Sequence, residues 1–246
     1  MDLDESPEPE TKLPAPKSPV PGGTPSAGND TYPTDFVDPR LSDPWPMGIV
    51  GNIGSGKTVL VERLIQMWKF IFDVIVIISP TYGLQPHHEL RDARGIVVFE
   101  TFSVENLNVI KQHQQARNIS VGTGPPRVSR MLLILDDNGT ATRKLLQGGA
   151  LDDLIIKCRH FKINIVQLAQ RYTQLSPTLR ANCKYLILFS ECNPQERRNL
   201  YMYHGFGDRK WFFKIFDQHT NKQYSWIGLQ CFPRHYQWFT AADGYL

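Results

Sequence analysis

The segment GIVGNIGSGKTVL, residues 48–60, places four glycines, a lysine and a threonine between a short apolar run and the start of a helical pattern. Its centre, Gly51-Asn52-Ile53-Gly54-Ser55-Gly56-Lys57-Thr58, fits the pattern G-x-x-x-x-G-K-[ST] at every position. Glycines allow backbone N–H groups to turn inward around a phosphate, because side chains would block the approach of its oxygens. The sequence therefore predicts a phosphate-binding loop at residues 51–58, between a strand and a helix.

The last two residues of this loop predict the cofactors. Lys57 is placed to reach the β- and γ-phosphates of ATP, and Thr58 offers a hydroxyl to Mg²⁺. A helix that begins near Lys57 would add unpaired N–H groups and the positive end of its dipole. We therefore expect residues 51–58 to bind ATP together with Mg²⁺.

Apolar runs of strand length alternate with longer segments of helical period along the rest of the chain. The runs are residues 47–50, 73–79, 95–100, 131–136, 163–170 and 184–190. Most are continuously apolar, as strands are when helices cover both faces of a parallel sheet. A helix is also predicted over NPQERRNLYMYHG, with Asn193 as its N-cap, Glu196 in capping-box position and Gly205 as its end. The expected fold is α/β, with a mostly parallel central sheet flanked by helices.

Charge and proline content divide the chain into three parts. Residues 1–45 hold 9 acidic and 3 basic side chains and ten of the eighteen prolines, so we expect a disordered acidic arm. Residues 46–205 hold the predicted ATPase core, and residues 206–246 form an aromatic-rich extension of the same domain. Beyond residue 45 the chain has 24 basic and 15 acidic side chains, a surplus that suits a polyanionic partner but does not establish one.

Composition also bears on membranes and on metals. No apolar run approaches the roughly 20 residues that cross a bilayer, and the acidic N-terminus is unlike a signal peptide, so no membrane span is expected. The four cysteines, Cys158, Cys183, Cys192 and Cys231, have neither the close pairs of a zinc site nor the density of a disulfide scaffold. We expect reduced, mostly buried thiols.

A second motif, RMLLILDDNG, closes an apolar run with two carboxylates and has the pattern of a Walker B strand. Adjacent carboxylates at the end of a buried strand are costly unless a metal ion or water compensates them. Asp136 is the predicted magnesium residue, and Asp137 is the predicted base that orients and deprotonates the attacking water. An acidic pair that merely ends a strand is the alternative interpretation.

Three further polar residues are candidates for the site. Gln170 ends the strand INIVQLAQ and is predicted either to sense the γ-phosphate or to act only as a capping residue. Arg159, beside His160, is either an exposed charge, a helix C-cap or an arginine that enters a neighbouring subunit's nucleotide site. Arg180, in SPTLRANC, is the second candidate for that arginine.

The segment after Gly205 is rich in aromatic residues. RKWFFKIFDQHTNKQYSWIGLQ is interpreted as two strands around a polar turn at residues 218–222, a C-terminal hairpin that extends the sheet. Its aromatic rings, with Lys210, Lys214 and Arg234, either stack on nucleic acid or fill the core. Core packing is favoured, because duplex DNA presents its phosphates to a protein and keeps its bases stacked inside.

Together these motifs resemble the FtsK-HerA branch of P-loop ATPases, and within it the genome-packaging ATPases of poxvirus-like, giant-virus, virophage and Polinton-type DNA viruses. The resemblance spans residues 46 to about 205, and its most specific part runs from the Arg159-His160 pair through Gln170 to SPTLRANC. It implies a RecA/FtsK-like P-loop NTPase fold. Members of this branch often have glutamate after the magnesium aspartate, where this chain has the shorter Asp137.

The resemblance also implies a function and partners. It implies an ATPase that forms a homo-oligomeric ring, pentamer or hexamer, and pumps double-stranded DNA into a preformed capsid. Capsid proteins would be further partners, and the protein would work in the host cytoplasm or nucleus at sites of virus assembly, or with the virion. A nucleoside or small-molecule kinase shares the glycine loop but needs an acceptor pocket and an arginine-bearing lid, and no arginine-dense segment is present. A non-catalytic, nucleotide-gated scaffold would not need the Asp136-Asp137 pair.

Overall fold

The computed structural model covers all 246 residues of the chain. The residues whose structure is described are 43–68, 70–81, 95–119, 129–136, 149–191, 193–205, 207–231 and 237–240. Among them, no helix combines the length and the apolar character needed to cross a membrane. The predicted N-terminal arm lies outside this set except for its last three residues. Trp45 among these is buried edge-on against Trp68 and Tyr185, so the core begins no later than Trp45.

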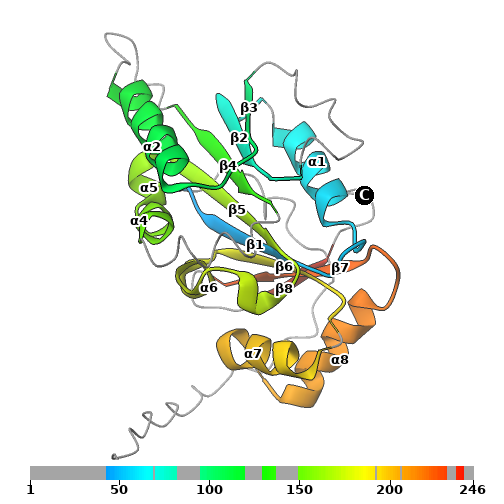
Figure 1. Cartoon of the computed structure of the whole chain (residues 1–246). Helices are drawn as coiled ribbons and strands as arrows, with labels where there is room; N and C mark the ends of the chain where they lie inside the picture. The colour runs from blue at the N-terminus through cyan, green and yellow to red at the C-terminus, as the bar shows by residue number, and fades with distance from the viewer. Residues whose placement is uncertain are drawn as a thin grey trace, which may run out of the picture.

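An eight-stranded sheet forms the centre of the molecule, in the order β3-β2-β4-β5-β1-β6-β7-β8 (Figure 1). The strands are β1 (Pro46–Val50), β2 (Val74–Ile78), β3 (Ile96–Phe99), β4 (Met131–Leu135), β5 (Ile163–Ala169), β6 (Tyr185–Phe189), β7 (Trp226–Gln230) and β8 (Gln237–Thr240). The first six pair in parallel, and β7 and β8 continue the sheet in antiparallel register. All six predicted strands, and their parallel arrangement, are confirmed.

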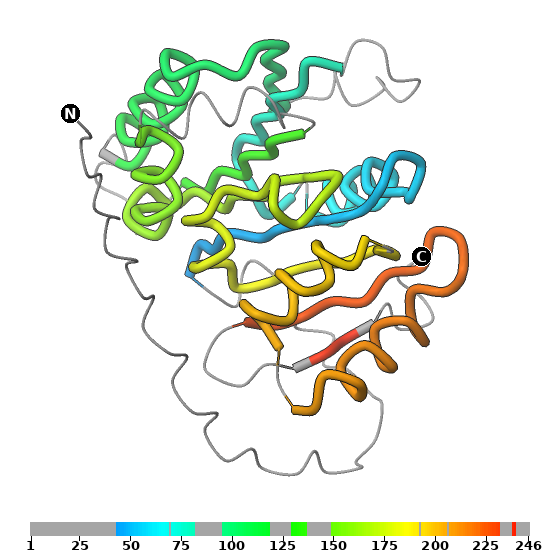
Figure 2. The backbone as a smooth tube through the Cα atoms, turned by 60° about the horizontal axis from the view of Figure 1, so that its bottom comes forward, coloured from blue at the N-terminus to red at the C-terminus, as the bar shows by residue number. Residues whose placement is uncertain are grey.

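Helices cover both faces of this sheet. They are α1 (Lys57–Trp68), α2 (Val104–Ile119), α4 (Ala150–Ile156), α5 (Cys158–Phe161), α6 (Pro177–Asn182), α7 (Pro194–His204) and α8 (Arg209–Thr220), with a 3₁₀ turn at Tyr172–Gln174. The apolar side of α1 packs on one face, whereas the other helices contribute to the core on the opposite face. In Figure 2, α7 and α8 lie beside the β6–β8 half of the sheet, and α2 and α4 lie towards β2 and β4. Burial on both faces explains why the strand sequences are continuously apolar.

The C-terminal hairpin was predicted in the wrong place. Residues 209–220, expected to include its first strand, form helix α8, and the antiparallel pair consists of β7 and β8. Asp208 caps α8 by accepting hydrogen bonds from the backbone N–H groups of Lys210 and Trp211. Phe212 and Phe216, four residues apart, are both fully buried on one side of the helix. Their burial also favours core packing over nucleic-acid stacking for these two rings.

Helix α7 begins as predicted, but its capping box is not formed. The Asn193 side chain accepts hydrogen bonds from the backbone N–H groups of Gln195 and Glu196. The Glu196 carboxylate instead accepts from the backbone N–H and the hydroxyl of Thr173, at 3.0 and 2.6 Å. These two hydrogen bonds connect the first turn of α7 to the segment that follows β5.

Candidate nucleotide-binding site

The carboxyl ends of β4, β5 and β1 meet at one edge of the sheet. These strands are adjacent and parallel, with Val50 opposite Ala169 and Leu135 opposite Gln167. The backbone N–H of Gly51 donates to the carbonyl of Ala169, at 3.1 Å. The predicted phosphate loop, Asp136 and Gln170 therefore leave the sheet from neighbouring strand ends, although they lie far apart in sequence.

Glycine geometry in the loop agrees with phosphate binding. Gly54 and Gly56 have φ angles of 77° and 99°, in the left-handed region that other residues rarely adopt. A Cβ atom at Gly51 would lie 2.5 Å from the Ser55 hydroxyl and 2.7 Å from Cβ of Phe189. The loop connects directly to α1, whose first N–H groups lack partners within the helix. This backbone conformation is compatible with the anion-binding turn that the motif predicts.

The Lys57 side chain lies over this loop. Its ammonium group donates hydrogen bonds to the carbonyls of Gly51 and Asn52, at 2.6 and 2.9 Å. Lys57 and Thr58 are both half-buried in the first turn of α1, whereas Asn52 and Ile53 are exposed at the loop tip. The positive charge is thus held at the loop by two backbone carbonyls.

Asp136 is held at the end of β4 by a residue that the sequence interpretation did not select. The carboxylate is only 8% exposed, and its Oδ2 accepts a hydrogen bond from the Ser79 hydroxyl at 3.2 Å. Ser79 follows the neighbouring strand β2 and is fully buried. Its position at the end of the DVIVIIS run was the only sequence signal for this role. Asp137, the predicted base, lies outside the described residues.

Gln170 lies beside the loop at the end of β5. Its backbone N–H donates to the Gln174 side chain at 3.1 Å, and its own side chain is half-buried. The carbonyl of Ala169 accepts the hydrogen bond from Gly51, so Gln170, the next residue, lies beside the first residue of the loop at the carboxyl end of the sheet. The Gln170 position therefore suits a group that faces a bound γ-phosphate.

The two candidate arginines have different surroundings. Arg159 is exposed on α5, immediately before the amino end of β5. Since β5 has seven residues, it spans about 20 Å, more than an arginine side chain can reach. Arg180 is half-buried on α6, with its guanidinium 5.3 Å from the Tyr172 ring centre and 5.2 Å from that of Tyr203. Arg159 is therefore too far along the sheet to contact a phosphate on its own chain's loop.

Tyr224 is a further residue at the loop that sequence analysis missed. A Cβ atom built on Gly56 would lie 3.2 Å from Cδ1 of Tyr224, so this ring lies against the loop backbone. Tyr224 has a φ of 65°, a left-handed conformation that is rare for an aromatic residue, and its side chain is 58% exposed. Strain of this kind clusters at ligand sites.

A comparison with protein-family models decides the family. The model described as Poxvirus A32 protein matches residues 36–217, and this range includes the phosphate loop, Asp136, Gln170 and both candidate arginines. The chain belongs to the poxvirus A32 family. The recognition of a viral packaging-ATPase relative is thus confirmed at the level of the family.

Individual relatives of this A32-family chain agree with the family match. Protein 075L of Invertebrate iridescent virus 6, an uncharacterized protein, is 23% identical over 154 residues, covering 63% of this chain and 57% of its own length. The DNA packaging protein OPG160 of vaccinia virus (strain Western Reserve) is 28% identical over 159 residues, covering 61% of this chain and 54% of its own length. The chain thus spans about half the length of the curated relatives it matches.

A solved structure supports the fold. The genome packaging NTPase B204 of Sulfolobus turreted icosahedral virus 2, in complex with ATP-gammaS, superimposes with a TM-score of 0.56. It is 17% identical, and the match covers 80% of this chain and 97% of B204. At this identity the likeness concerns the fold, and it confirms the predicted P-loop ATPase architecture.

Proposed function

We propose that this protein is an ATPase that moves double-stranded DNA into a viral capsid. The observation that carries the proposal is the single sheet edge that brings the phosphate loop, Asp136 and Gln170 together in an A32-family chain. The DNA packaging name of the vaccinia relative and the packaging NTPase with a bound ATP analogue support the same function. The protein would act in the infected host cell, where virions assemble.

The residues of the two sequence motifs have proposed roles in ATP hydrolysis. Lys57 and the loop N–H groups bind the β- and γ-phosphates, and Asp137 accepts a proton from the attacking water. Thr58 and Asp136 would hold Mg²⁺, because they offer the oxygen ligands that this hard cation prefers. The hydrogen bond from Ser79 fits this role, because a hydrogen bond to a ligating carboxylate orients it for the metal. The ion would supply charge compensation for the phosphates when bound.

The position of Arg159 supports an oligomeric ring. It is exposed and lies at the edge of the sheet opposite the loop, which suits an arginine that enters the site of a neighbouring subunit. A closed ring of five or six subunits would place one such arginine at every nucleotide. Arg180 is the less favoured candidate, because its guanidinium already packs on two tyrosine rings.

Phosphate release from ATP, measured with and without duplex DNA, tests the proposed function. We expect hydrolysis that duplex DNA stimulates. Turnover that requires a nucleoside or other small acceptor would instead assign the kinase function. No turnover under any of these conditions would assign the nucleotide-gated scaffold.

Replacement of Tyr224 tests whether its ring contacts the nucleotide base. Stacking of a base on an aromatic ring contributes about 1–3 kcal/mol, so Tyr224→Ala should raise the dissociation constant of ATP about 5- to 150-fold. Tyr224→Phe should bind like the wild type, because it keeps the ring. Phe70→Ala is the matched control, since Phe70 is 86% exposed beyond the far end of α1. Wild-type affinity in Tyr224→Ala, measured by titration with a fluorescent ATP analogue, would exclude the contact.

A further inference from the structure

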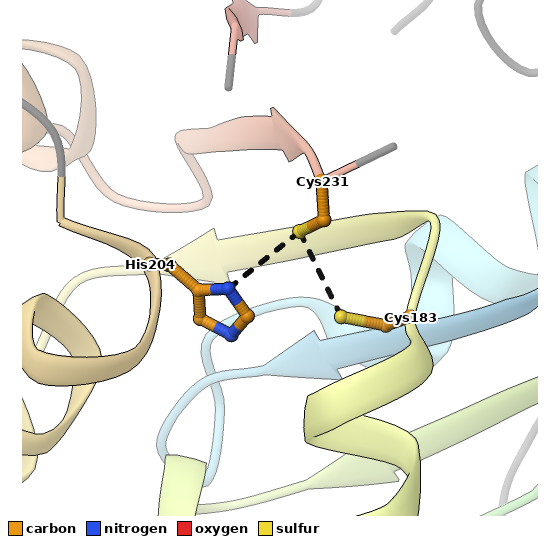
Figure 3. Close-up of side chains that lie close together, drawn as sticks. All are labelled: Cys183, His204 and Cys231. Carbon is orange, nitrogen blue, oxygen red and sulfur yellow. Dashed lines mark hydrogen bonds between the residues drawn. The ribbon is translucent and has the colours of Figure 1, made fainter. Parts of the chain in front are cut away.

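Three metal-binding side chains from distant parts of the sequence converge on the β6–β7 side of the sheet (Figure 3). Cys183 ends α6, His204 is the last residue of α7, and Cys231 follows β7. All three are buried. The backbone N–H of Cys231 donates to the carbonyl of Lys184 at 2.8 Å, and this bond connects the segment after β7 to the segment between Cys183 and β6.

The distances within this cluster fit a tetrahedral metal ion. The Sγ atoms of Cys183 and Cys231 are 3.7 Å apart, and Sγ of Cys231 is 3.8 Å from Nδ1 of His204. All ligand atoms lie within 4.8 Å of one another. A zinc ion with ordinary Zn–S and Zn–N bonds separates its tetrahedral ligands by about 3.5–3.8 Å. Two of the three distances are therefore already those of a zinc site.

A second residue orients the histidine for this role. The hydroxyl of Tyr172 lies 3.0 Å from Nε2 of His204, the ring nitrogen other than the one that faces Cys231. Metal-binding histidines commonly donate their other ring N–H to an oxygen, which fixes the tautomer and the ring plane. Tyr172 is buried, and burial raises its pKa well above the usual value, so it stays a neutral phenol that can accept this N–H. Nδ1 is then free of a proton on the side that faces the sulfur atoms.

We propose that Cys183, His204 and Cys231 bind a Zn²⁺ ion, with a water molecule as the fourth ligand. Binding replaces the two thiol protons, which leave to solvent, so that two thiolates, a neutral imidazole and Zn²⁺ form a complex without net charge. A neutral complex suits a buried position, where an uncompensated ion would be costly. No change of oxidation state is involved.

The charge states of the cluster agree with this exchange. Burial, with a smaller effect from the Arg180 charge, lowers the pKa of His204 to about 4, so the ring is neutral and able to bind metal at neutral pH. A hydrogen bond between the Cys231 and Cys183 side chains, together with burial, raises the pKa of Cys231, so this thiol keeps its proton until a cation displaces it.

The zinc site would be structural. It would join the end of α6, the end of α7 and the end of β7, three segments that are far apart in sequence. Arg180 lies in the last turn of α6, three residues before Cys183, so the ion would also fix the helix that carries the second candidate arginine. The site lies outside the nucleotide-binding residues and does not depend on their proposed function.

Metal content and cobalt substitution test this proposal on the full chain. The chain purified under reducing conditions should contain one zinc per molecule, measured by mass spectrometry of the elements. Replacement by Co²⁺ should produce the strong visible absorption of tetrahedral cobalt with thiolate ligands. Cys183→Ser and Cys231→Ser should each lose that absorption, whereas Cys158→Ser, which removes a buried thiol elsewhere, should keep it.

The Tyr172→Phe variant distinguishes weaker metal binding from a general loss of folding. It removes only the hydroxyl that orients His204, so the cobalt absorption should remain, with an affinity about 10- to 100-fold lower. Far-ultraviolet circular dichroism checks that each variant is folded. Three results would overturn the proposal: a folded wild type without cobalt–thiolate absorption, the same absorption in the Cys183→Ser, Cys231→Ser double variant, or a Cys183–Cys231 disulfide found by peptide mass under non-reducing conditions.

Discussion

An Arg159→Ala subunit should lose about 10³- to 10⁵-fold in ATP hydrolysis, the usual effect of an arginine supplied in trans to a transferring phosphate. The physical reason is that the guanidinium compensates charge on the phosphate oxygens at a site on the next subunit. The loss should be partly reversed when Arg159→Ala is mixed with Lys57→Ala before assembly. In mixed rings, some sites combine an intact arginine from one subunit with an intact phosphate loop from its neighbour.

The mixing experiment needs two controls. Arg198→Ala removes an exposed arginine on α7 and should hydrolyse ATP like the wild type. The variants should be mixed as monomers, with DNA and nucleotide added afterwards, and ring formation should be checked by particle size. Failure to recover hydrolysis at any mixing ratio, with rings present, would remove Arg159 from the site and leave Arg180 to be tested in the same way.

Lys57→Ala should reduce ATP hydrolysis by at least about 10²-fold, the scale observed when one charge-stabilising group is removed from a transition state. The fold should remain intact, because Lys57 is half-exposed and its ammonium group bonds to carbonyls of the loop. Phosphate release and a thermal unfolding curve measure the two effects separately. Lys214→Ala, which removes an exposed lysine on α8, is the control for loss of positive charge. Wild-type turnover in Lys57→Ala would contradict the phosphate-loop assignment.

The parallel sheet could be predicted because strands that are buried on both faces have continuously apolar sequences. The carboxyl ends of such strands meet at one edge, so the motifs at Gly51, Asp136 and Gln170 could be assigned to one site without any structure. The helix cap at Asn193 could also be predicted, because its hydrogen bonds join residues that are only two and three positions apart. Each of these features depends on neighbours in sequence or on a regular pattern.

Other features depended on contacts that sequence does not display. Aromatic residues favour strands, which led to the wrong prediction for residues 209–217, although Asp208 and the four-residue spacing of Phe212 and Phe216 were signals for a helix. Cys183 and Cys231 are 48 residues apart, and Cys231 and His204 are 27 apart, so no metal-binding spacing was visible. Tyr224 reaches the phosphate loop only because β7 extends the sheet beside β6.

Movement of the protein along DNA is the most direct test of the central claim. The measurement is ATP-dependent displacement of a third strand from a triplex on linear duplex DNA, with Lys57→Ala and a non-hydrolysable ATP analogue as negative controls. The proposed translocase predicts displacement with ATP and the wild-type chain, and none in either control. DNA-stimulated ATP hydrolysis without displacement of the third strand would contradict it.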